Sequence, residues 1–353
     1  MTSIEIAGRR IGPGLPTYVI AEMSGNHNQS FEHALRIVRA AKDAGADAIK
    51  LQTYTADTLT IDSAEEPFRV GKGTAWEGKT LYELYGEAFT PWEWQPRIKE
   101  LANDLGMACF SSPFDATAVD FLEAMDVPAY KIASFELVDL QLIDRVARTG
   151  KPLIISTGLG SLRDIEDAVM TARATGLTQI ALLKCSSAYP APPDEINLNT
   201  IPDLARRFGV PIGLSDHTLG IGVPIAAIAV GATIIEKHMT LARTDPGPDN
   251  AFSLEPGEFK AMVDGIRVAE KALGSVSYGA TPSEEPGRVF RRSLFVVADV
   301  AAGESLTDHN VRSIRPGAGL APKELPTVLG RKAVRAIRRG TPLSWDLVEP
   351  DTR

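Results

Sequence analysis

Short runs of apolar and β-branched residues alternate with amphipathic segments along most of the chain, and this alternation limits the possible folds more than any other feature. Eight such runs occur: "TYVIAEM", "DAIKLQTY", "GMACFSSPF", "AYKIAS", "PLIISTG", "IALLKCSS", "VPIGLSDH" and "TIIEKHMT". The segments between them, such as 31–45 and 161–176, place apolar residues at helical spacing. This order indicates parallel strands joined by crossover helices.

Glycine residues mark the ends of most predicted helices. A glycine stands where most of the predicted helices end, just before the next strand, which is typical of a helix C-terminus. These residues are Gly45, Gly106, Gly150, Gly176, Gly209 and Gly231. Eight repeats over roughly 275 residues match the size of a (β/α)8 barrel. We therefore predict a TIM barrel, with a doubly wound sheet as the main alternative.

The chain beyond the repeats indicates a second domain. Residues 276–288 are rich in Ser, Pro, Gly and Glu and read as a linker. We predict a barrel domain at 1–275, the linker at 276–288 and a small domain at 289–353. Within the small domain, "VADVAAGESLTDHNV" and "VRAIRRGTPLSWDLV" share a Gly-x-x-Leu core, which indicates a pseudo-symmetric, β-rich module.

A long insertion interrupts the repeats between Thr55 and Thr90. Connections of this length are usually functional or mobile. We expect aromatic residues in and after the insertion to serve for packing, with a sugar platform, or a lid formed by those in the insertion, as the alternatives. They are Trp76, Tyr82, Tyr85, Trp92 and Trp94.

Charge and composition exclude several functions. A formal net charge of −8 argues against general nucleic-acid binding, which needs a basic surface. No apolar run approaches the roughly 20 residues that span a bilayer, and the first residues lack the apolar core of a signal peptide, so we expect a cytoplasmic protein. Cys109 and Cys185 lie in apolar runs without a CxxC partner. We expect both to be buried free thiols rather than a disulfide or zinc site.

Polar residues gather at the carboxyl ends of the predicted strands, where barrels bind their ligands. Strand alternation lets Ser215 share a face with His217, and Glu236 with His238, while neighbouring strands lie about 4.8 Å apart. Two imidazoles can thus meet and, with a carboxylate such as Glu22, hold a catalytic divalent metal. Two hydrogen-bonded histidines, or one acting as a general base, fit the same spacing.

Two lysines lie inside apolar runs. Lys50 in "AIKLQ" and Lys131 in "AYKIAS" would be buried, and a buried ammonium needs a partner. The partner is either a carboxylate such as Glu236 or an anionic ligand. Together with Ser134 and Ser156, the lysines form a cradle for phosphate or carboxylate. A desolvated lysine is also typical of Schiff-base aldolases.

The motifs "AEMSGNHN", "IKLQTY", "YKIAS", "STG", "SDHT", "EKHMTL" and "GPDNAFSLEP" follow one another in an order that resembles the sialic acid synthase family. This resemblance implies condensation of phosphoenolpyruvate with an amino-sugar aldose to give a nine-carbon 2-keto acid and phosphate. It covers nearly the whole chain, because "GRVFRRSLFVVADVAAGESLT" and "RPGAGL" are similar to the family's antifreeze-like (SAF, β-clip) domain.

The resemblance also implies roles for individual residues. His217 and His238 would hold a divalent metal, commonly manganese, with magnesium or cobalt as alternatives. Glu22 would hold the activated water or sugar hydroxyls, and Glu236 would help to position the substrates. The implied phosphoenolpyruvate-binding residues are Lys50, Lys131, Ser134, Ser156, Ser187 and Ser215; the implied sugar-binding residues are Gln52, Tyr189, Asp249 and Arg315. Arg315, or the nearby Arg312, would come from the partner subunit of a domain-swapped homodimer.

One branch of the family fits best. Where sialic acid synthases read approximately "AEIGxNHNG", this chain has "AEMSGNHNQ", and "WEGKTLYELYGEAFTPWEW" and "LLKCSSAYPAP" resemble the pseudaminic acid synthase branch. The implied acceptor is 2,4-diacetamido-2,4,6-trideoxy-L-altrose, and Met23 is our candidate contact for this more apolar sugar. The alternatives are N-acetylneuraminate or legionaminate synthesis and, more remotely, a Schiff-base aldolase or a noncatalytic carbohydrate-binding protein.

Overall fold

The computed structural model describes residues 3–71 and 76–350, and its larger part is a closed barrel of eight parallel strands. All eight predicted runs form strands, which confirms the TIM barrel and excludes the doubly wound sheet. The last strand pairs with the first, with His238 opposite Glu22. The strands are β3 (Tyr18–Glu22), β4 (Ala48–Thr53), β5 (Ala108–Pro113), β6 (Tyr130–Ile132), β7 (Leu153–Ser156), β8 (Ile180–Cys185), β9 (Ile212–Asp216) and β10 (Ile234–His238).

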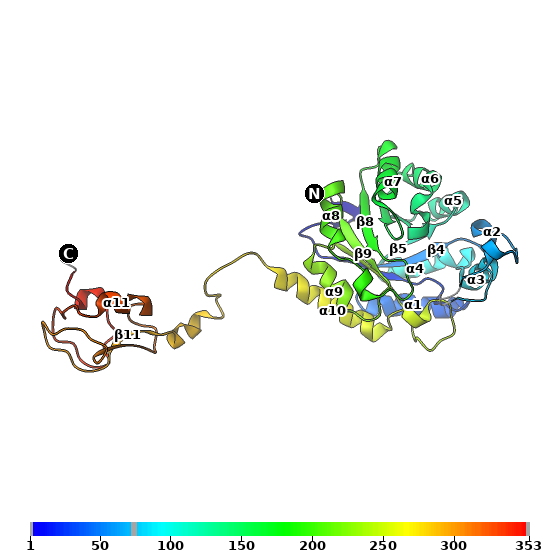
Figure 1. Ribbon diagram of the computed structural model, residues 1–353. Helices are drawn as coiled ribbons and strands as arrows, with labels where there is room; N and C mark the ends of the chain where they lie inside the picture. Colours follow the sequence, from blue (N-terminus) through cyan, green and yellow to red (C-terminus); the bar gives the residue numbers. More distant parts are fainter. Residues whose placement is uncertain (1–2, 72–75, 351–353) are drawn as a thin grey trace. The chain divides into compact units, whose positions relative to one another are not determined.

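Helices surround the barrel (Figure 1). In α7, Ile165, Ala168, Val169 and Ala172 are buried at helical spacing, and the Ser161 hydroxyl caps the first turn by accepting from the Asp164 N–H. Each crossover helix in this way presents one apolar face to the strands. The helices are α1 (Phe31–Asp43), α4 (Gln95–Asp104), α5 (Ala116–Ala124), α6 (Leu140–Ala147), α7 (Leu162–Ala174), α8 (Thr200–Phe208), α9 (Gly222–Ala229) and α10 (Pro256–Leu273).

The six glycines predicted at helix ends all have positive φ angles. Gly209 is the clearest case, because it is the C-cap of α8 at φ 68° and ψ 19° and its N–H donates to the Ala205 carbonyl. A side chain disfavours this left-handed conformation, so glycine lets the chain turn from helix into strand within a few residues.

A hairpin of β1 (Ile4–Ile6) and β2 (Arg9–Ile11) packs on the barrel, a feature that the strand repeat did not predict. Its Ile4, Ile6 and Ile11 side chains are buried in the main apolar core. The Glu5 N–H donates to the Gln179 side chain just before β8, so the hairpin lies at the amino ends of the strands. The opposite end of the barrel stays available for ligands.

The insertion between β4 and α4 contains α2 (Ala56–Leu59), α3 (Leu81–Ala88) and 3₁₀ turns at Glu66–Phe68 and, after its end, Trp92–Trp94. Residues 72–75 of this insertion lie outside the described residues. Short 3₁₀ turns also occur at Ser134–Val138, Pro193–Glu195 and Asn250–Phe252. No helix in the described ranges is both long and apolar enough to cross a membrane.

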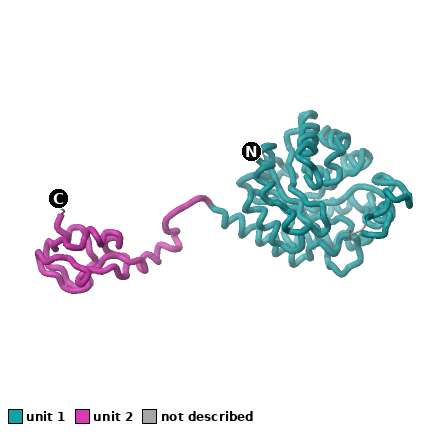
Figure 2. The backbone as a smooth tube through the Cα atoms, in the orientation of Figure 1, with its two compact units in different colours: residues 1–274 teal, residues 275–353 magenta. Residues whose placement is uncertain are grey.

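The chain divides into two compact units, residues 1–274 and 275–353 (Figure 2). The second unit has its own apolar core, which includes Leu306 and Leu343 from the two Gly-x-x-Leu segments. Part of the segment predicted as a linker forms a 3₁₀ helix, Glu285–Phe290. The other elements are β11 (Ser293–Val296) and antiparallel β12 (Val311–Ile314), α11 (Leu325–Val328), and 3₁₀ turns at Pro322–Glu324 and Trp345–Leu347.

Candidate active site

A cavity of about 430 Å³ opens at the carboxyl ends of the barrel strands. Most of the residues predicted from the sequence line it, because strand alternation turns them to the same side as expected. Those that line it are Lys50, Gln52, Lys131, Ser134, Ser156, Tyr189, Ser215, His217, Glu236, His238 and Asp249.

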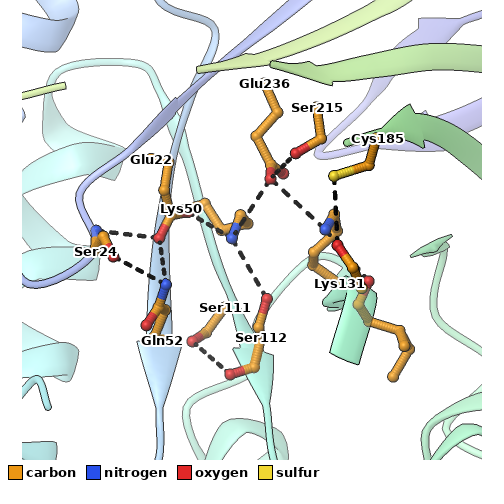
Figure 3. A network of polar contacts seen from close by, with 12 residues as sticks. Glu22, Ser24, Lys50, Gln52, Ser111, Ser112, Lys131, Cys185, Ser215 and Glu236 are labelled. Carbon is orange, nitrogen blue, oxygen red and sulfur yellow. Dashed lines mark hydrogen bonds and ion pairs between the residues drawn. The ribbon is translucent and has the colours of Figure 1, made fainter. Parts of the chain in front are cut away.

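Two lysines and two carboxylates meet at the floor of this cavity (Figure 3). Lys50 Nζ lies 2.5 Å from Glu22 Oε2 and 3.7 Å from Glu236 Oε1, while Lys131 Nζ lies 3.6 Å from the same Glu236 oxygen. All four side chains are buried. The lysines therefore have carboxylate partners, one of the two possibilities raised by the sequence. The pairing is uneven, because Lys50 has a carboxylate oxygen at 2.5 Å whereas the carboxylate nearest to Lys131 is at 3.6 Å.

Burial and these partners set the charge of each group. Burial raises the pKa of Glu22 to about 7, although Lys50 opposes this. For Glu236, burial is outweighed by Lys131 and Lys50, which hold its pKa below the ordinary value. Burial lowers the pKa of Lys131 in spite of Glu236, whereas Glu22 and Glu236 overcome burial and raise the pKa of Lys50. Lys131 is thus the less compensated of the two cations.

Hydroxyl groups surround the lysines. Ser156 Oγ is buried and has no hydrogen-bond partner among the described residues. Ser215 Oγ donates to Glu236 Oε1 at 3.1 Å, and Ser134 Oγ lies 3.4 Å from Cys185 Sγ. A buried polar group without a partner is costly. A donor of this kind in the same cavity as an undercompensated ammonium suits an anion such as phosphate or carboxylate.

The two histidines converge as the strand pattern predicts. His217 and His238 have ring centroids 5.2 Å apart, at the ends of adjacent strands. His217 Nδ1 lies 2.9 Å from the Ser186 carbonyl, to which it donates, so its Nε2 keeps a free lone pair. Burial, and then His217, hold the pKa of His238 well below the ordinary value, and its buried Nδ1 has no hydrogen-bond partner in the described chain. Burial opposes protonation of His217, but Cys185, whose Sγ lies 3.9 Å from its Nδ1, and the Ser186 carbonyl raise its pKa above the ordinary value. Two imidazoles facing one cavity fit a divalent transition metal when both are deprotonated.

No cluster of three or more His, Cys, Asp or Glu side chains suited to a metal occurs among residues 3–71 and 76–350. The pair of histidines could therefore supply only part of a coordination sphere. Water and substrate oxygens would have to complete it, which is typical of catalytic rather than structural metal sites.

Amide, hydroxyl and carboxyl groups line the cavity beside the histidines. Gln52 Nε2 donates to Glu22 Oε1 at 3.1 Å and to Ser24 Oγ at 3.0 Å, and Ser24 Oγ donates to Asp249. The Tyr189 ring lies 4.3 Å from the His217 ring, centroid to centroid. This side of the cavity offers the mixed donors and acceptors that read sugar hydroxyl and amide groups.

Some predicted residues lie elsewhere. Glu22 is not itself part of the cavity lining, although it contacts Lys50 and Gln52, which are, and Ser187 lies beyond β8 with its Oγ 3.7 Å from Cys185 Sγ. Arg315 is exposed after β12 in the C-terminal unit. The prediction for Met23 is wrong: it is fully buried in the apolar core. Alternation explains this, because a residue next to the inward-facing Glu22 points outward.

Two further polar residues belong to the site, and sequence reasoning missed one of them, Glu136. Ser112, at the end of β5, accepts from Lys50 Nζ at 3.4 Å. Glu136 lines the cavity, burial raises its pKa to about 7, and its Oε2 has no hydrogen-bond partner within the described ranges. Glu136 lies in a 3₁₀ turn rather than a strand, so the alternation rule did not reach it.

The aromatic residues singled out from the sequence differ in their surroundings. Trp76 and Tyr85 line the cavity. Trp92 packs on Phe121 and donates to the Tyr54 carbonyl, and Trp94 packs on His27 and Phe31. Both cysteines are buried and free.

Comparison with known proteins agrees with this geometry. The NeuB family matches residues 37–278, and a SAF domain matches residues 291–349. The pseudaminic acid synthase of Helicobacter pylori is 45% identical over 335 residues, which is 95% of this chain and 98% of that protein. The N,N'-diacetyllegionaminic acid synthase of Legionella pneumophila is 37% identical over 343 residues, 96% of each chain.

A solved structure extends the likeness to the fold. The crystal structure of the spore coat polysaccharide biosynthesis protein SpsE of Bacillus subtilis matches with a TM-score of 0.67 and 34% identity. The match covers 99% of this chain and 100% of that one. The resemblance inferred from the motifs, including the antifreeze-like domain, is confirmed at the level of the family: the chain belongs to the NeuB family and carries a SAF domain.

Proposed function

We propose that the protein is a pseudaminic acid synthase, a transferase that condenses phosphoenolpyruvate with 2,4-diacetamido-2,4,6-trideoxy-L-altrose. The products are a nine-carbon 2-keto sugar acid and phosphate. The observation that carries the proposal is the convergence of Lys50, Lys131 and Ser156 with His217 and His238 in one cavity. Similarity to the Helicobacter pylori enzyme over nearly the whole chain supports this choice of acceptor over the legionaminate alternative.

Anion binding is the first task of the site. The ammonium groups of Lys50 and Lys131 and the hydroxyls of Ser134, Ser156 and Ser215 hold the phosphate and carboxylate of phosphoenolpyruvate. Lys131, which has the weaker internal pairing, contributes most to this attraction. These groups are fixed before the substrate arrives, so little reorganisation accompanies the reaction.

The reaction joins C3 of phosphoenolpyruvate to the aldehyde carbon of the open-chain sugar, whose oxygen becomes a hydroxyl group. Water then adds through its oxygen to C2 and loses a proton, and cleavage of the C2–O bond expels phosphate and leaves the 2-keto acid. A divalent metal held by His217 and His238, manganese in our proposal, would supply Lewis-acid polarisation of the aldehyde. Glu22, with a pKa of about 7, exchanges a proton readily near neutral pH.

Residues at the side of the cavity orient the sugar. Gln52 and Asp249 are linked by hydrogen bonds through Ser24, so the two side chains keep a fixed spacing for the sugar hydroxyls that they bind. Tyr189 packs against His217 and closes the sugar site beside the metal-binding imidazoles. A contact from Arg315 of a second subunit, in a domain-swapped homodimer, is part of the proposal.

The test is phosphate release from phosphoenolpyruvate by EDTA-stripped protein, with and without added manganese. The acceptors are the diacetamido-trideoxy-altrose, its legionaminic-type isomer and N-acetylmannosamine. We expect metal-dependent release with the first sugar, and mass spectrometry of the product should give the nine-carbon acid. Release with none of the sugars, together with a borohydride-trapped lysine adduct, would support the aldolase alternative instead.

A further inference from the structure

The cavity has two chemically different sides. Its floor carries the lysines, serines and histidines, whereas the segment between β4 and α4 contributes Arg69, Trp76, Tyr85 and a group of aliphatic side chains. We call these aliphatic residues the apolar wall: Leu59 from α2, Val70, and Leu81 and Leu84 from α3. Figure 1 places α2 and α3 side by side at one edge of the barrel. Among the described residues of this segment that line the cavity, Arg69 is the one with a charged side chain.

Several contacts hold the apolar wall in place without a ligand. The Tyr54 ring lies edge-on to Tyr85 of α3 at 5.8 Å and to Phe114 after β5 at 5.0 Å. Trp76 Nε1 donates to the Pro248 carbonyl at 2.8 Å, which ties the segment to the loop after β10. The wall is therefore preformed, and a ligand does not have to assemble it.

The reacting groups decide which end of the acceptor meets the wall. With phosphoenolpyruvate on Lys50 and Lys131 and the aldehyde beside His238, the carbons farthest from the aldehyde extend away from the polar floor. Transfer of a methyl group from water to an aliphatic surface is favourable. A hydroxyl that packs against Leu59, Val70, Leu81 or Leu84 loses its water and meets aliphatic carbon there.

We propose that the apolar wall receives the methyl-bearing end of the acceptor and selects a 6-deoxy sugar over its 6-hydroxy counterpart. This inference rests on the proposed function and assigns a specificity role to Leu59, Val70, Leu81 and Leu84. It replaces Met23, which is buried in the core, as the source of the preference. An apolar pocket rejects an added hydroxyl by about ten- to a hundredfold in kcat/KM.

The experiment measures kcat/KM for phosphate release with the 6-deoxy acceptor and with 2,4-diacetamido-2,4-dideoxy-L-altrose, which restores the 6-hydroxyl. Val70→Thr and Leu81→Asn each place a hydrogen-bonding group on the wall at nearly unchanged size. Ile61→Thr is the matched control, because Ile61 lies in the same segment, is 60% exposed and does not line the cavity. Thermal unfolding checks that each variant is folded.

We expect wild-type protein to prefer the 6-deoxy acceptor at least tenfold. Val70→Thr and Leu81→Asn should each reduce this ratio threefold or more, with the KM for phosphoenolpyruvate unchanged, while Ile61→Thr keeps the wild-type ratio. Equal use of both sugars by wild-type protein overturns the proposal, even if neither variant folds. So does an unchanged ratio in two folded wall variants. Absence of turnover with either sugar refutes the condensation itself, a different failure, and the proposal for the wall falls with it.

Discussion

The charged floor of the cavity consists of Lys50, Lys131, Glu22 and Glu236. Replacing Lys131 by methionine should change substrate binding strongly and the stability of the fold little. Lys131 Nζ lies 3.6 Å from Glu236 and donates to the Ile132 carbonyl at 3.2 Å. Glu236 also has Lys50 at 3.7 Å and the Ser215 hydroxyl at 3.1 Å. Lys131→Met therefore removes a cation that we propose binds phosphoenolpyruvate, but leaves no carboxylate without a partner.

The expected effects follow from these distances. A charge-assisted hydrogen bond contributes about 1.5 to 3 kcal/mol, and two unit charges 4 Å apart attract each other by about 4 kcal/mol at an effective dielectric of 20. A loss of about 3 to 4 kcal/mol lowers kcat/KM for phosphoenolpyruvate by roughly a hundred- to a thousandfold. The free energy of unfolding should change by less than about 2 kcal/mol, because removal of a buried charge offsets the lost pairing.

Phosphate release at varied phosphoenolpyruvate concentration and urea unfolding measure the two quantities. Lys184→Met is the matched control: Lys184 on β8 also donates to the carbonyl of the next residue, at 2.8 Å, but does not line the cavity. We expect it to keep kcat/KM within about threefold. Equal losses of activity in both variants, or a loss in Lys131→Met smaller than fivefold, would refute the reasoning.

Three further predictions concern the pH dependence of stability, a buried ion pair and metal binding. His27 accepts from the Gln29 N–H, and burial lowers its pKa to about 4. Because the neutral form is favoured in the folded state, the contribution of His27 to stability is complete above about pH 6.5. It is lost, by about 3 kcal/mol in total, as the pH falls towards 4. His27→Asn should flatten this part of a stability profile from urea unfolding, and an unchanged slope would contradict the assignment. The buried Lys237 ammonium lies 2.5 Å from the Asp216 carboxylate and also donates to the Thr218 carbonyl. Asp216→Asn removes its charged partner and should cost about 3 to 5 kcal/mol in the same assay; a loss below about 1 kcal/mol counts against this. His238→Ala should weaken manganese binding in calorimetry by about a hundredfold with an unchanged circular dichroism spectrum, whereas near-normal binding would place the metal elsewhere.

The barrel and its charged floor could be predicted because both follow from strand periodicity. Val, Ile and Leu runs ending at polar residues define the strands, and alternation then assigns Lys50, Lys131, His217 and His238 to one interior. The same rule applied to Met23 would have placed it outside, next to the inward-facing Glu22. That error came from proximity along the chain rather than from the pattern.

The apolar wall and Glu136 could not be predicted in this way. Both lie in segments without a repeating period, the insertion after β4 and the 3₁₀ turn after β6. Their positions depend on tertiary contacts between distant segments, such as the bond from Trp76 to Pro248 and the ring contact between Tyr54 and Phe114. Such contacts leave no local signal in the sequence.

The pairing of the last barrel strand with the first has a consequence for how the protein is made. Glu22 emerges early in synthesis, and His238, its opposite in the ladder, emerges only after the other seven strands. Until β10 docks, both β3 and β9 present unpaired strand edges, and contacts of such long sequence separation form slowly. The pair of His217 and His238 and the charged floor are completed by the same closing event. A nascent or truncated chain that lacks β10 therefore has no assembled site, so catalytic competence itself reports that the barrel has closed.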